Sequence, residues 1–259
     1  MKKIILLICS LWLFTQLPVC AQEYGPMLRA AMRFLGTPYV AHTLEVNEDE
    51  CLVVNLNQVD CTTFVEYVLA AALSGKPVDE IPQEEFINNL RKVRYRDGHI
   101  DGYTSRLHYV ADWINDNIRM GLIEDVTARH SPDTLVLSLS FMSANAGKYR
   151  QLKDAPDKVE IMKRYEQELT GQTVHWLPKD KLPAGGLPWI KNGDIIALMT
   201  SIDGLDVSHM GIAIYVNDKL HLLHASSAKK TVLIDQLPLN RYLNRGKKLT
   251  GIRVLRAKL

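Results

Sequence analysis

The sequence predicts an α+β fold in which a helical N-terminal lobe packs on a small antiparallel β-sheet or barrel. Two observations support this prediction. In the first half, apolar residues recur every three or four positions, which is the period of a helix. In the second half, short alternating segments are separated by turn-forming residues, which is typical of antiparallel strands. We therefore divide the chain into a helical lobe, residues 22–130, and a β lobe, residues 131–259, with a helical insertion at about 150–185.

Residues 1–21 have the pattern of a secretory signal, which predicts export to the periplasm. Two lysines precede the apolar run Ile4–Phe14, and Val19-Cys20-Ala21 resembles a cleavage site. The apolar run is too short to predict a membrane span. The stretch before Cys20 also loosely resembles a lipobox, in which Cys20 would carry a lipid. Because Val19 is large for that motif, we expect cleavage after Ala21.

The net charge limits the expected binding partners, and the cysteine content raises the possibility of a disulfide. Removal of residues 1–21 takes away two lysines and no acidic residue, so the remainder has as many basic as acidic side chains. This balance argues against nucleic acid or an anionic membrane as a default partner. The two cysteines left are Cys51 and Cys61. A disulfide between them is the alternative to a reactive Cys61, because it would silence the thiol.

The helical period marks five segments, and strands are expected later in the chain. The helices are expected at residues 23–40, from Cys61 onward, at 82–95, at 109–120 with Trp113, Ile114 and Ile118 inward, and at 157–169. The strands are expected at residues 134–140, 194–199, 208–216, 219–225, 231–234 and 250–255. Residues 177–190 are rich in proline and glycine and are expected to form an extended loop.

Cys61 stands at the predicted start of a buried helix. Asp60 is a good N-cap, because its carboxylate can accept a backbone N–H that the helix leaves free. Apolar residues then follow at helical spacing, and Gly75 and Pro77 supply a stop. The positive end of the helix favours the thiolate, which is the nucleophilic form. Asp60 opposes this if its charge faces the sulfur, so a cationic partner would help.

Two histidines lie on neighbouring predicted strands. If Asn217-Asp218 is a two-residue hairpin turn, Val216 pairs with Lys219, and His209 and His224 become diagonal neighbours on one face. His221 then falls on the opposite face. A three-residue turn would instead place His221, and not His224, on the same face as His209.

A cysteine with two histidines suits nucleophilic acyl transfer. One imidazole takes the proton of the thiol, and the third group fixes the tautomer and orientation of that imidazole. The same histidines are also candidates for zinc ligands, but the alternation of strand faces argues against convergence of all three. We therefore predict no metal and no cofactor.

Residues 94–108 are too rich in arginine, tyrosine and histidine to be a simple linker. Their side chains can bind carboxylates or sugar hydroxyls. The alternative is a salt-bridged surface loop. The candidate binding residues are Arg94, Arg96, Tyr103, Ser105, Arg106 and His108.

Short motifs in a fixed order carry a family resemblance. They are Gly36-Thr37-Pro38-Tyr39, Asp60-Cys61-Thr62, Gly193-Asp194, Ser208-His209-Met210-Gly211 and His224-Ala225-Ser226. Together they resemble the NlpC/p60 cell-wall cysteine peptidases, whose members are papain-like. A longer set comprises residues 36–45, Arg94-Tyr95-Arg96-Asp97-Gly98, Ser105-Arg106-Leu107-His108-Tyr109 and Asp112-Trp113-Ile114. This set is similar to the N-acetylmuramoyl-L-alanine amidase-like branch.

The resemblance implies a cysteine amidase that acts on peptidoglycan fragments. Members of the branch cut between N-acetylmuramic acid, preferably its 1,6-anhydro form, and L-Ala during cell-wall turnover. By position, Cys61 would be the nucleophile, His209 the base and His224 the orienting residue. Tyr39 would line the site and help to bind the oxyanion. Ala41-His42-Thr43 and Thr62-Thr63 depart from the usual superfamily pattern, which affects the expected peptide subsites.

Two other functions remain open. The first is an endopeptidase of the same superfamily that cuts within the stem peptide. The second is a non-catalytic module that binds the cell wall, with Cys51 and Cys61 in a disulfide.

Overall fold

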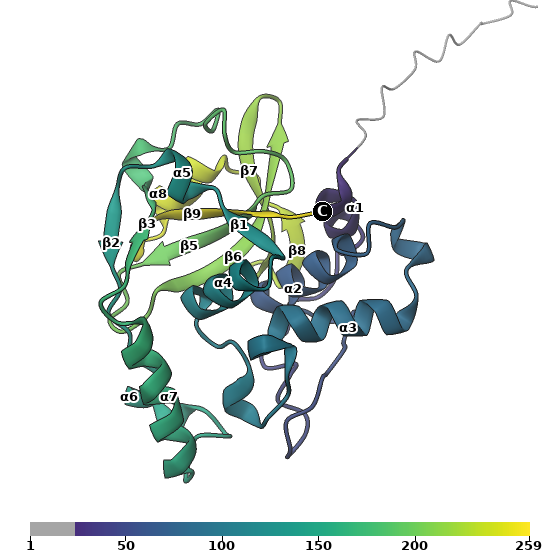
Figure 1. Cartoon of the computed structure of the whole chain (residues 1–259). Coiled ribbons are helices and arrows are strands. Elements are labelled where there is room, and N and C mark those ends of the chain that lie inside the picture. The colour runs from purple at the N-terminus through teal and green to yellow at the C-terminus, as the bar shows by residue number, and fades with distance from the viewer. Residues whose placement is uncertain (1–23) are drawn as a thin grey trace, which may run out of the picture.

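The computed structural model describes residues 24–259, so the expected signal, with Cys20, lies outside the described part. A seven-stranded antiparallel sheet is its centre, with strand order β1-β9-β5-β6-β7-β8 and with β4 also paired to β9 (Figure 1). Its strands are β1 (Ile123–Asp125), β4 (Leu177–Pro178), β5 (Ile195–Thr200), β6 (Val207–Val216), β7 (Lys219–Ser226), β8 (Thr231–Ile234) and β9 (Leu249–Ala257). A separate pair is formed by β2 (Thr134–Val136) and β3 (Thr173–His175).

The hairpin between β6 and β7 has the predicted register. Val216 pairs with Lys219, and Asn217 and Asp218 both have positive φ, at 48° and 59°. Positive φ at both central residues defines the tight turn whose twist matches the flanking strands. The two-residue turn is therefore confirmed, and with it the placing of His224 and His221 on opposite faces of β7.

The helices confirm four of the five predicted segments closely. They are α2 (Cys61–Ala72), α3 (Gln83–Arg94), α4 (Val110–Arg119) and α7 (Pro156–Leu169). The first helix, α1 (Pro26–Met32), is shorter than expected, because the chain turns after Arg33 and reaches Gly36 with φ of 82°. The short helices are α5 (Thr127–His130), α6 (Phe141–Ala144) and α8 (Leu239–Arg245).

Two predictions about individual segments are wrong. Ile118, expected to face inward, is 38% exposed at the end of α4. The strand expected over residues 134–140 stops at Val136, because only Thr134–Val136 finds a partner, in β3. Leu137 and Leu139 are still buried, against the helix α7. The sequence also gave no sign of β1, which crosses from the helical lobe to pair with β9.

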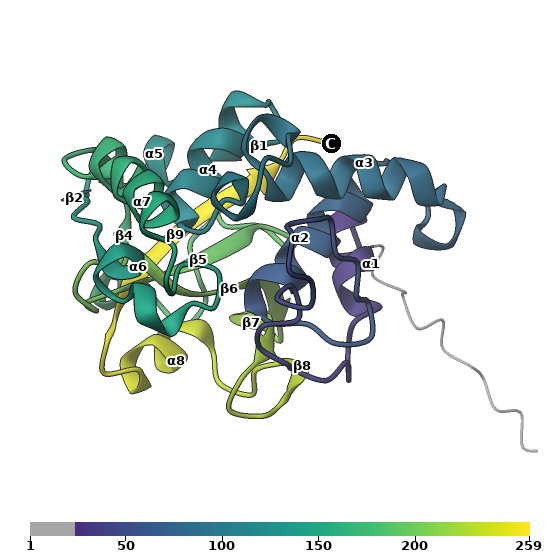
Figure 2. The same ribbon diagram turned by 90° about the horizontal axis from the view of Figure 1, so that it is seen from below.

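The core has one layer on each face of the sheet. Ile195 and Ala197 of β5 pack in the cluster with α1, α2 and α4, whereas Ile196 and Leu198 face the cluster that contains Leu239 and Leu243 of α8. This alternation follows from the two-residue period of a strand. A third cluster packs α7 on the segment before α4. Figure 2 shows α2 and α3 on the opposite side of the sheet from α8.

Candidate active site

Cys61 is the first residue of α2, and its position is fixed by a capping box. The Asp60 carboxylate accepts the Thr63 N–H at 2.8 Å, and the Thr63 hydroxyl accepts the Asp60 N–H at 2.9 Å. Two backbone donors that a helix start would leave free are thereby satisfied. The sulfur lies next to the Met210 N–H and 4.0 Å from the Thr62 hydroxyl. The sequence prediction of the cap and of Cys61 at N1 is confirmed.

The Cys61 thiol is not acidic by position alone. Burial raises its pKa to about 11, and the Asp60 carboxylate adds to the rise. The Met210 N–H, the Thr62 hydroxyl and the Cys61 N–H oppose these effects and lower the pKa. The expectation that the helix start favours the thiolate is thus outweighed by desolvation. A base that takes the proton is therefore required for reactivity.

His209 and His224 are in direct contact. His209 Nε2 lies 2.6 Å from His224 Nδ1, with the rings nearly perpendicular at 86°. Burial and then the neighbouring His224 lower the pKa of His209 to about 3. His224 is fully buried, which lowers its pKa, while Asp235 acts in the opposite direction. Both imidazoles are therefore neutral at pH 7.

His221 stands apart from this pair. Its Nδ1 lies 2.8 Å from the Asp235 carbonyl oxygen, on the other face of β7. Within residues 24–259, no group of three or more histidine, cysteine or acidic side chains is arranged to hold a metal ion.

Tyr39 is also placed near Cys61. It forms a parallel bridge with Val59, two residues before Cys61, and its N–H donates to the Lys230 carbonyl. Burial raises the pKa of Tyr39 to about 12, and the charges of Cys61 and Asp60 add to this. The hydroxyl therefore keeps its proton and remains a hydrogen-bond donor.

Comparison with known proteins shows which family the chain belongs to. The sequence profile of the N-acetylmuramoyl-L-alanine amidase-like (AmiA-like) family matches residues 29–252. The chain belongs to this family. A search of curated proteins finds none that matches.

Solved structures include several similar to this family member. A crystal structure of an N-acetylmuramoyl-L-alanine amidase from Bacteroides uniformis has 56% identity and a TM-score of 0.88, over 90% of this chain and 99% of that one. A Bacteroides fragilis protein named provisionally as a xylanase has 57% identity and a TM-score of 0.85, over 88% and 99%. A Legionella pneumophila protein of 24% identity, with a TM-score of 0.67 over 90% and 88%, shares the fold.

The three arginines of the family member's polar segment form internal ion pairs. Arg94, with 0% exposure, donates to Glu66 of α2 at 2.6 Å and to the Val53 carbonyl. Arg106, 7% exposed, holds Glu45 and Glu50, each at 3.0 Å. Arg96 binds Asp112 through two nitrogens. In this structure the guanidinium groups are thus engaged within the protein. Arg94 and Arg106 are buried and Arg96 is half-buried, which differs from the solvated part of the loop alternative, although its salt bridges are present.

The other predicted binding residues have mixed positions. Ser105 donates its hydroxyl to the Gly102 carbonyl and accepts the Asp101 N–H, so it closes a local turn. His108 Nε2 lies 2.8 Å from the Tyr103 carbonyl oxygen. Tyr103 and His108 together line a cavity of about 380 Å³ with His42, Glu45 and residues 148–151. Of the predicted binding residues, Tyr103 and His108 line this cavity.

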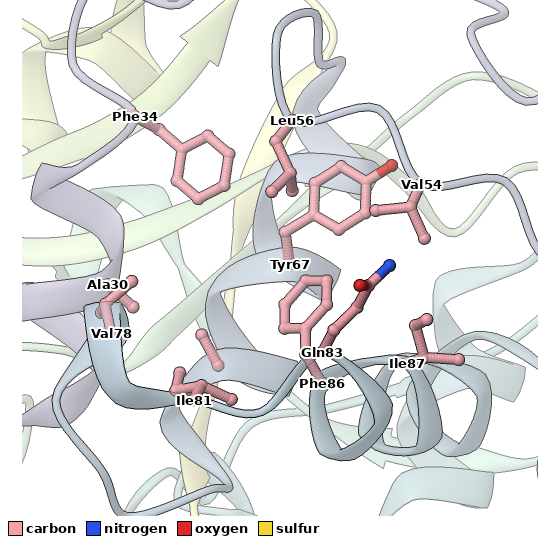
Figure 3. A pocket seen from close by; sticks show the side chains of 11 residues that line it. Ala30, Phe34, Val54, Leu56, Tyr67, Val78, Ile81, Gln83, Phe86 and Ile87 are labelled. Carbon is pink, nitrogen blue, oxygen red and sulfur yellow. The ribbon is translucent and has the colours of Figure 1, made fainter.

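A second cavity, of about 340 Å³, lies away from the cysteine and histidines (Figure 3). Its walls are mainly apolar, and they come from α1, α2, α3 and the segment before α2. Figure 3 shows Phe34 and Tyr67 across from Ile81 and Phe86, and none of Tyr39, Cys61, His209 or His224 lines it.

Both cysteines of the described range are free. Cys51 is exposed and accepts a contact from the Asn47 amide at 2.9 Å, while Cys61 is partly buried. A disulfide between Cys51 and Cys61, which the sequence left open, is therefore absent from residues 24–259. No helix within that range is long and apolar enough to cross a membrane.

Two side chains that contact His224 of the histidine pair were not predicted from the sequence. Asp235 Oδ2 lies 3.6 Å from His224 Nε2, and the Tyr242 ring of α8 packs edge-on against His224 at 5.5 Å. The β7–β8 register pairs His224 with Leu233, so Asp235 is a diagonal neighbour of His224. The four-residue connection between β7 and β8 left this register undetermined from sequence.

Proposed function

We propose that this protein is a cysteine-dependent amidase that cuts the bond between N-acetylmuramic acid and L-Ala in peptidoglycan fragments. The observation that supports this most directly is that the Cys61 sulfur lies next to the N–H of Met210, the residue after His209 of the His209–His224 pair, in a chain of the amidase-like family. The Bacteroides uniformis relative carries the amidase name. The order of cysteine helix and then histidine strands favours a papain-like member of the NlpC/p60 superfamily.

The proposed reaction proceeds through a thioester. The Cys61 sulfur attacks the lactyl carbonyl carbon, and its proton passes to His209. The C–N bond breaks as His209 returns the proton to the L-Ala nitrogen. Water then attacks the thioester, with His209 again as base, and releases the lactyl carboxylate and the thiol.

The site residues fit these steps. His209 Nε2 faces His224, so Nδ1 is the nitrogen left to take the thiol proton. The neutral forms of Cys61 and His209 imply that the proton moves as the sulfur attacks, since burial disfavours a separated ion pair at rest. The Cys61 N–H and the Tyr39 hydroxyl are the proposed donors for the developing oxyanion.

We further propose soluble 1,6-anhydro muropeptides as the substrates, in cell-wall turnover in the periplasm. The cavity lined by Tyr103 and His108 offers polar side chains that a ligand could contact. A pocket that pairs buried polar groups with a ligand strongly rejects an analogue that lacks the matching group. Periplasmic placement rests on the signal-like residues 1–21.

The main test is substitution of the nucleophile. Cys61→Ala is expected to abolish release of L-Ala peptides from anhydro-muropeptide, while the melting temperature stays near that of the parent. Cys61→Ser should be nearly inactive, because the site uses a thiol. Cys51→Ala is the matched control, since Cys51 is free and exposed. Turnover retained by Cys61→Ala would exclude the cysteine mechanism.

The alternatives give different results in the same assay. Inhibition by an alkylating agent but not by a chelator favours cysteine over zinc. Products cut within the stem peptide, with the lactyl amide intact, would indicate an endopeptidase. Binding to the cell wall without turnover by the parent protein would indicate a non-catalytic module.

Substrate size tests the enclosed pocket. Intact cross-linked sacculus is expected to be a poor substrate beside soluble fragments, and reducing-end fragments poorer than anhydro ones. Release of stem peptides from sacculi as fast as from fragments would show an open groove instead.

A further inference from the structure

Asp235 is held in place with one carboxylate oxygen directed at the histidine pair. Its Oδ1 accepts the Leu237 N–H at 2.8 Å, and its own N–H donates to the Leu222 carbonyl at 2.8 Å. Its carbonyl oxygen lies 2.8 Å from His221 Nδ1. These contacts fix the turn after β8 and leave Oδ2 facing His224 Nε2 at 3.6 Å.

The other end of that contact has no alternative partner among the described residues. His224 is fully buried, and its Nε2 makes no hydrogen bond within residues 24–259. A buried N–H without a partner is costly, so a carboxylate at this distance is the group able to satisfy it. Hydrogen bonds of catalytic groups are often long before substrate binds.

The contact between Asp235 and His224 also affects His209, because the two histidines share a hydrogen bond. For His209 Nδ1 to accept a proton, the proton of neutral His209 must reside on Nε2. That Nε2–H must then donate to His224 Nδ1, 2.6 Å away, which is possible only if the proton of His224 resides on Nε2. A carboxylate beside His224 Nε2 selects this tautomer.

We propose that Asp235 is a positioning residue that sets the tautomers of His224 and, through it, of His209, in a relay Cys61–His209–His224–Asp235. This inference rests on the proposed function only for its turnover readout. It adds an anionic end to the site, which stabilises the imidazolium that forms when the thiol gives up its proton.

The Asp60 carboxylate is a charged group that acts on the Cys61 end of the relay. Tyr242 packs against His224, and Cys61 approaches from α2. Lys229 and Arg245 line, with Asp235 and Tyr242, a cavity of about 570 Å³ on the outer side of the carboxylate. The measurements are made at about 0.15 M salt, where exposed charges are screened beyond about 8 Å.

Asp235→Asn tests the proposal with little change in shape. The amide oxygen can still accept the Leu237 N–H, but the amide nitrogen, in the place of Oδ2, donates to His224 Nε2 and forces the other tautomer. We expect kcat/KM to fall about 10–100-fold, as for other residues that orient a reacting group through a neighbour. Gln236→Ala, an exposed neighbour in the same turn, should leave kcat/KM unchanged.

Two readouts do not depend on the substrate. The rate of Cys61 alkylation by iodoacetamide at pH 7–8 should fall in Asp235→Asn, because the base no longer faces the thiol. The ¹⁵N shifts of His224 should report Nε2–H in the parent and Nδ1–H in the variant. A parent protein that alkylates readily but hydrolyses no muropeptide would count against the proposed function and not against the relay.

A double-mutant comparison separates positioning from folding. In a His224→Gln background, Asp235→Asn should cause no further loss of alkylation rate, since the relay is already cut. An equal loss in both backgrounds, or unchanged tautomers and alkylation in Asp235→Asn, would overturn the proposal. If Asp235→Asn lowers the melting temperature below the assay temperature, Asp235→Ser, which keeps an acceptor for Leu237, takes its place.

Discussion

At the scale of single residues, desolvation controls the chemistry more than the helix field does. The partly positive helix start is worth about 0.3–1 kcal/mol at exposed sites. Burial instead raises the Cys61 pKa to about 11 and contributes to lowering the His209 pKa to about 3. The thiol and the imidazole are therefore both neutral at rest, and the proposed mechanism depends on the geometry of proton transfer between them.

His209 is predicted to be essential for turnover. His209→Ala should lower kcat/KM by about 10²–10⁴-fold, the usual contribution of a positioned base. His99→Ala, on an exposed histidine of the polar segment, should leave kcat/KM unchanged. Steady-state kinetics on soluble muropeptide measure both. A loss of less than about 5-fold in His209→Ala would remove His209 from the mechanism.

At the scale of elements, the polar segment 94–108 is tied by ion pairs to α2, the helix that carries Cys61, and to the segment before it. The buried Arg94–Glu66 pair ties the end of α3 to α2, and Arg106 ties the segment to Glu45 and Glu50. Taking one partner away leaves a buried charge uncompensated. Substitution of these arginines is thus expected to act first on stability, in contrast to the ligand contact that their composition suggested.

Arg94→Ala is predicted to lower the free energy of unfolding by about 3–5 kcal/mol. Arg33→Ala removes an exposed ion pair with Asp79 and should cost about 1 kcal/mol or less. Urea unfolding monitored by fluorescence measures both. A large rise in KM for Arg94→Ala at unchanged stability would restore a direct role in substrate binding.

Gly211 is predicted to be required by the contact of β6 with β7. A Cβ at Gly211 would lie 2.8 Å from a Leu222 methyl carbon and 2.9 Å from the Leu223 carbonyl oxygen. Gly211→Ala should therefore lower the free energy of unfolding by about 1–3 kcal/mol, the usual effect of overpacking. Gly147→Ala, with nothing within 4 Å of the added carbon, is the control, and equal effects of the two would contradict the prediction.

At the scale of the whole molecule, buried neutral histidines couple stability to pH. Burial lowers the pKa of His108 to about 3, and the Arg106 charge adds to this. An unfolded chain binds a proton to the same ring near pH 6.5. Between pH 6.5 and pH 3 the unfolded state therefore holds more protons, so stability is full above 6.5 and falls as pH decreases through this window.

His108→Asn is predicted to reduce the loss of stability that the protein shows as the pH falls below 6.5. Buried carboxyl groups such as Asp206, whose pKa is raised by burial, have the opposite dependence, but they are common to both proteins. The difference in unfolding free energy between parent and variant should shrink from pH 7 to pH 4. Denaturant unfolding at several pH values measures it, and a pH-independent difference would show that folding does not lower the pKa of His108.

Features that depend on residues close together in the chain could be predicted without the structure. Asp60 and Thr63 fix the start of α2 within one turn, and Asn217-Asp218 fixes the register that puts His209 beside His224. These features can be read from the sequence because the interacting groups are only a few residues apart. The mixed helix-and-sheet class and the positions of most strands along the sequence followed from the same local periodicity.

Contacts between elements that are distant in sequence could be seen only in the three-dimensional structure. Asp235 reaches His224 through the pairing of β7 with β8, and Arg94 reaches Glu66 from another helix. Strand β1 exists because β9 offers it an edge. Whether a charged side chain binds a ligand or an internal partner depends on burial and on groups distant in sequence, and the free energy of a buried charge is set by those groups rather than by the residue itself.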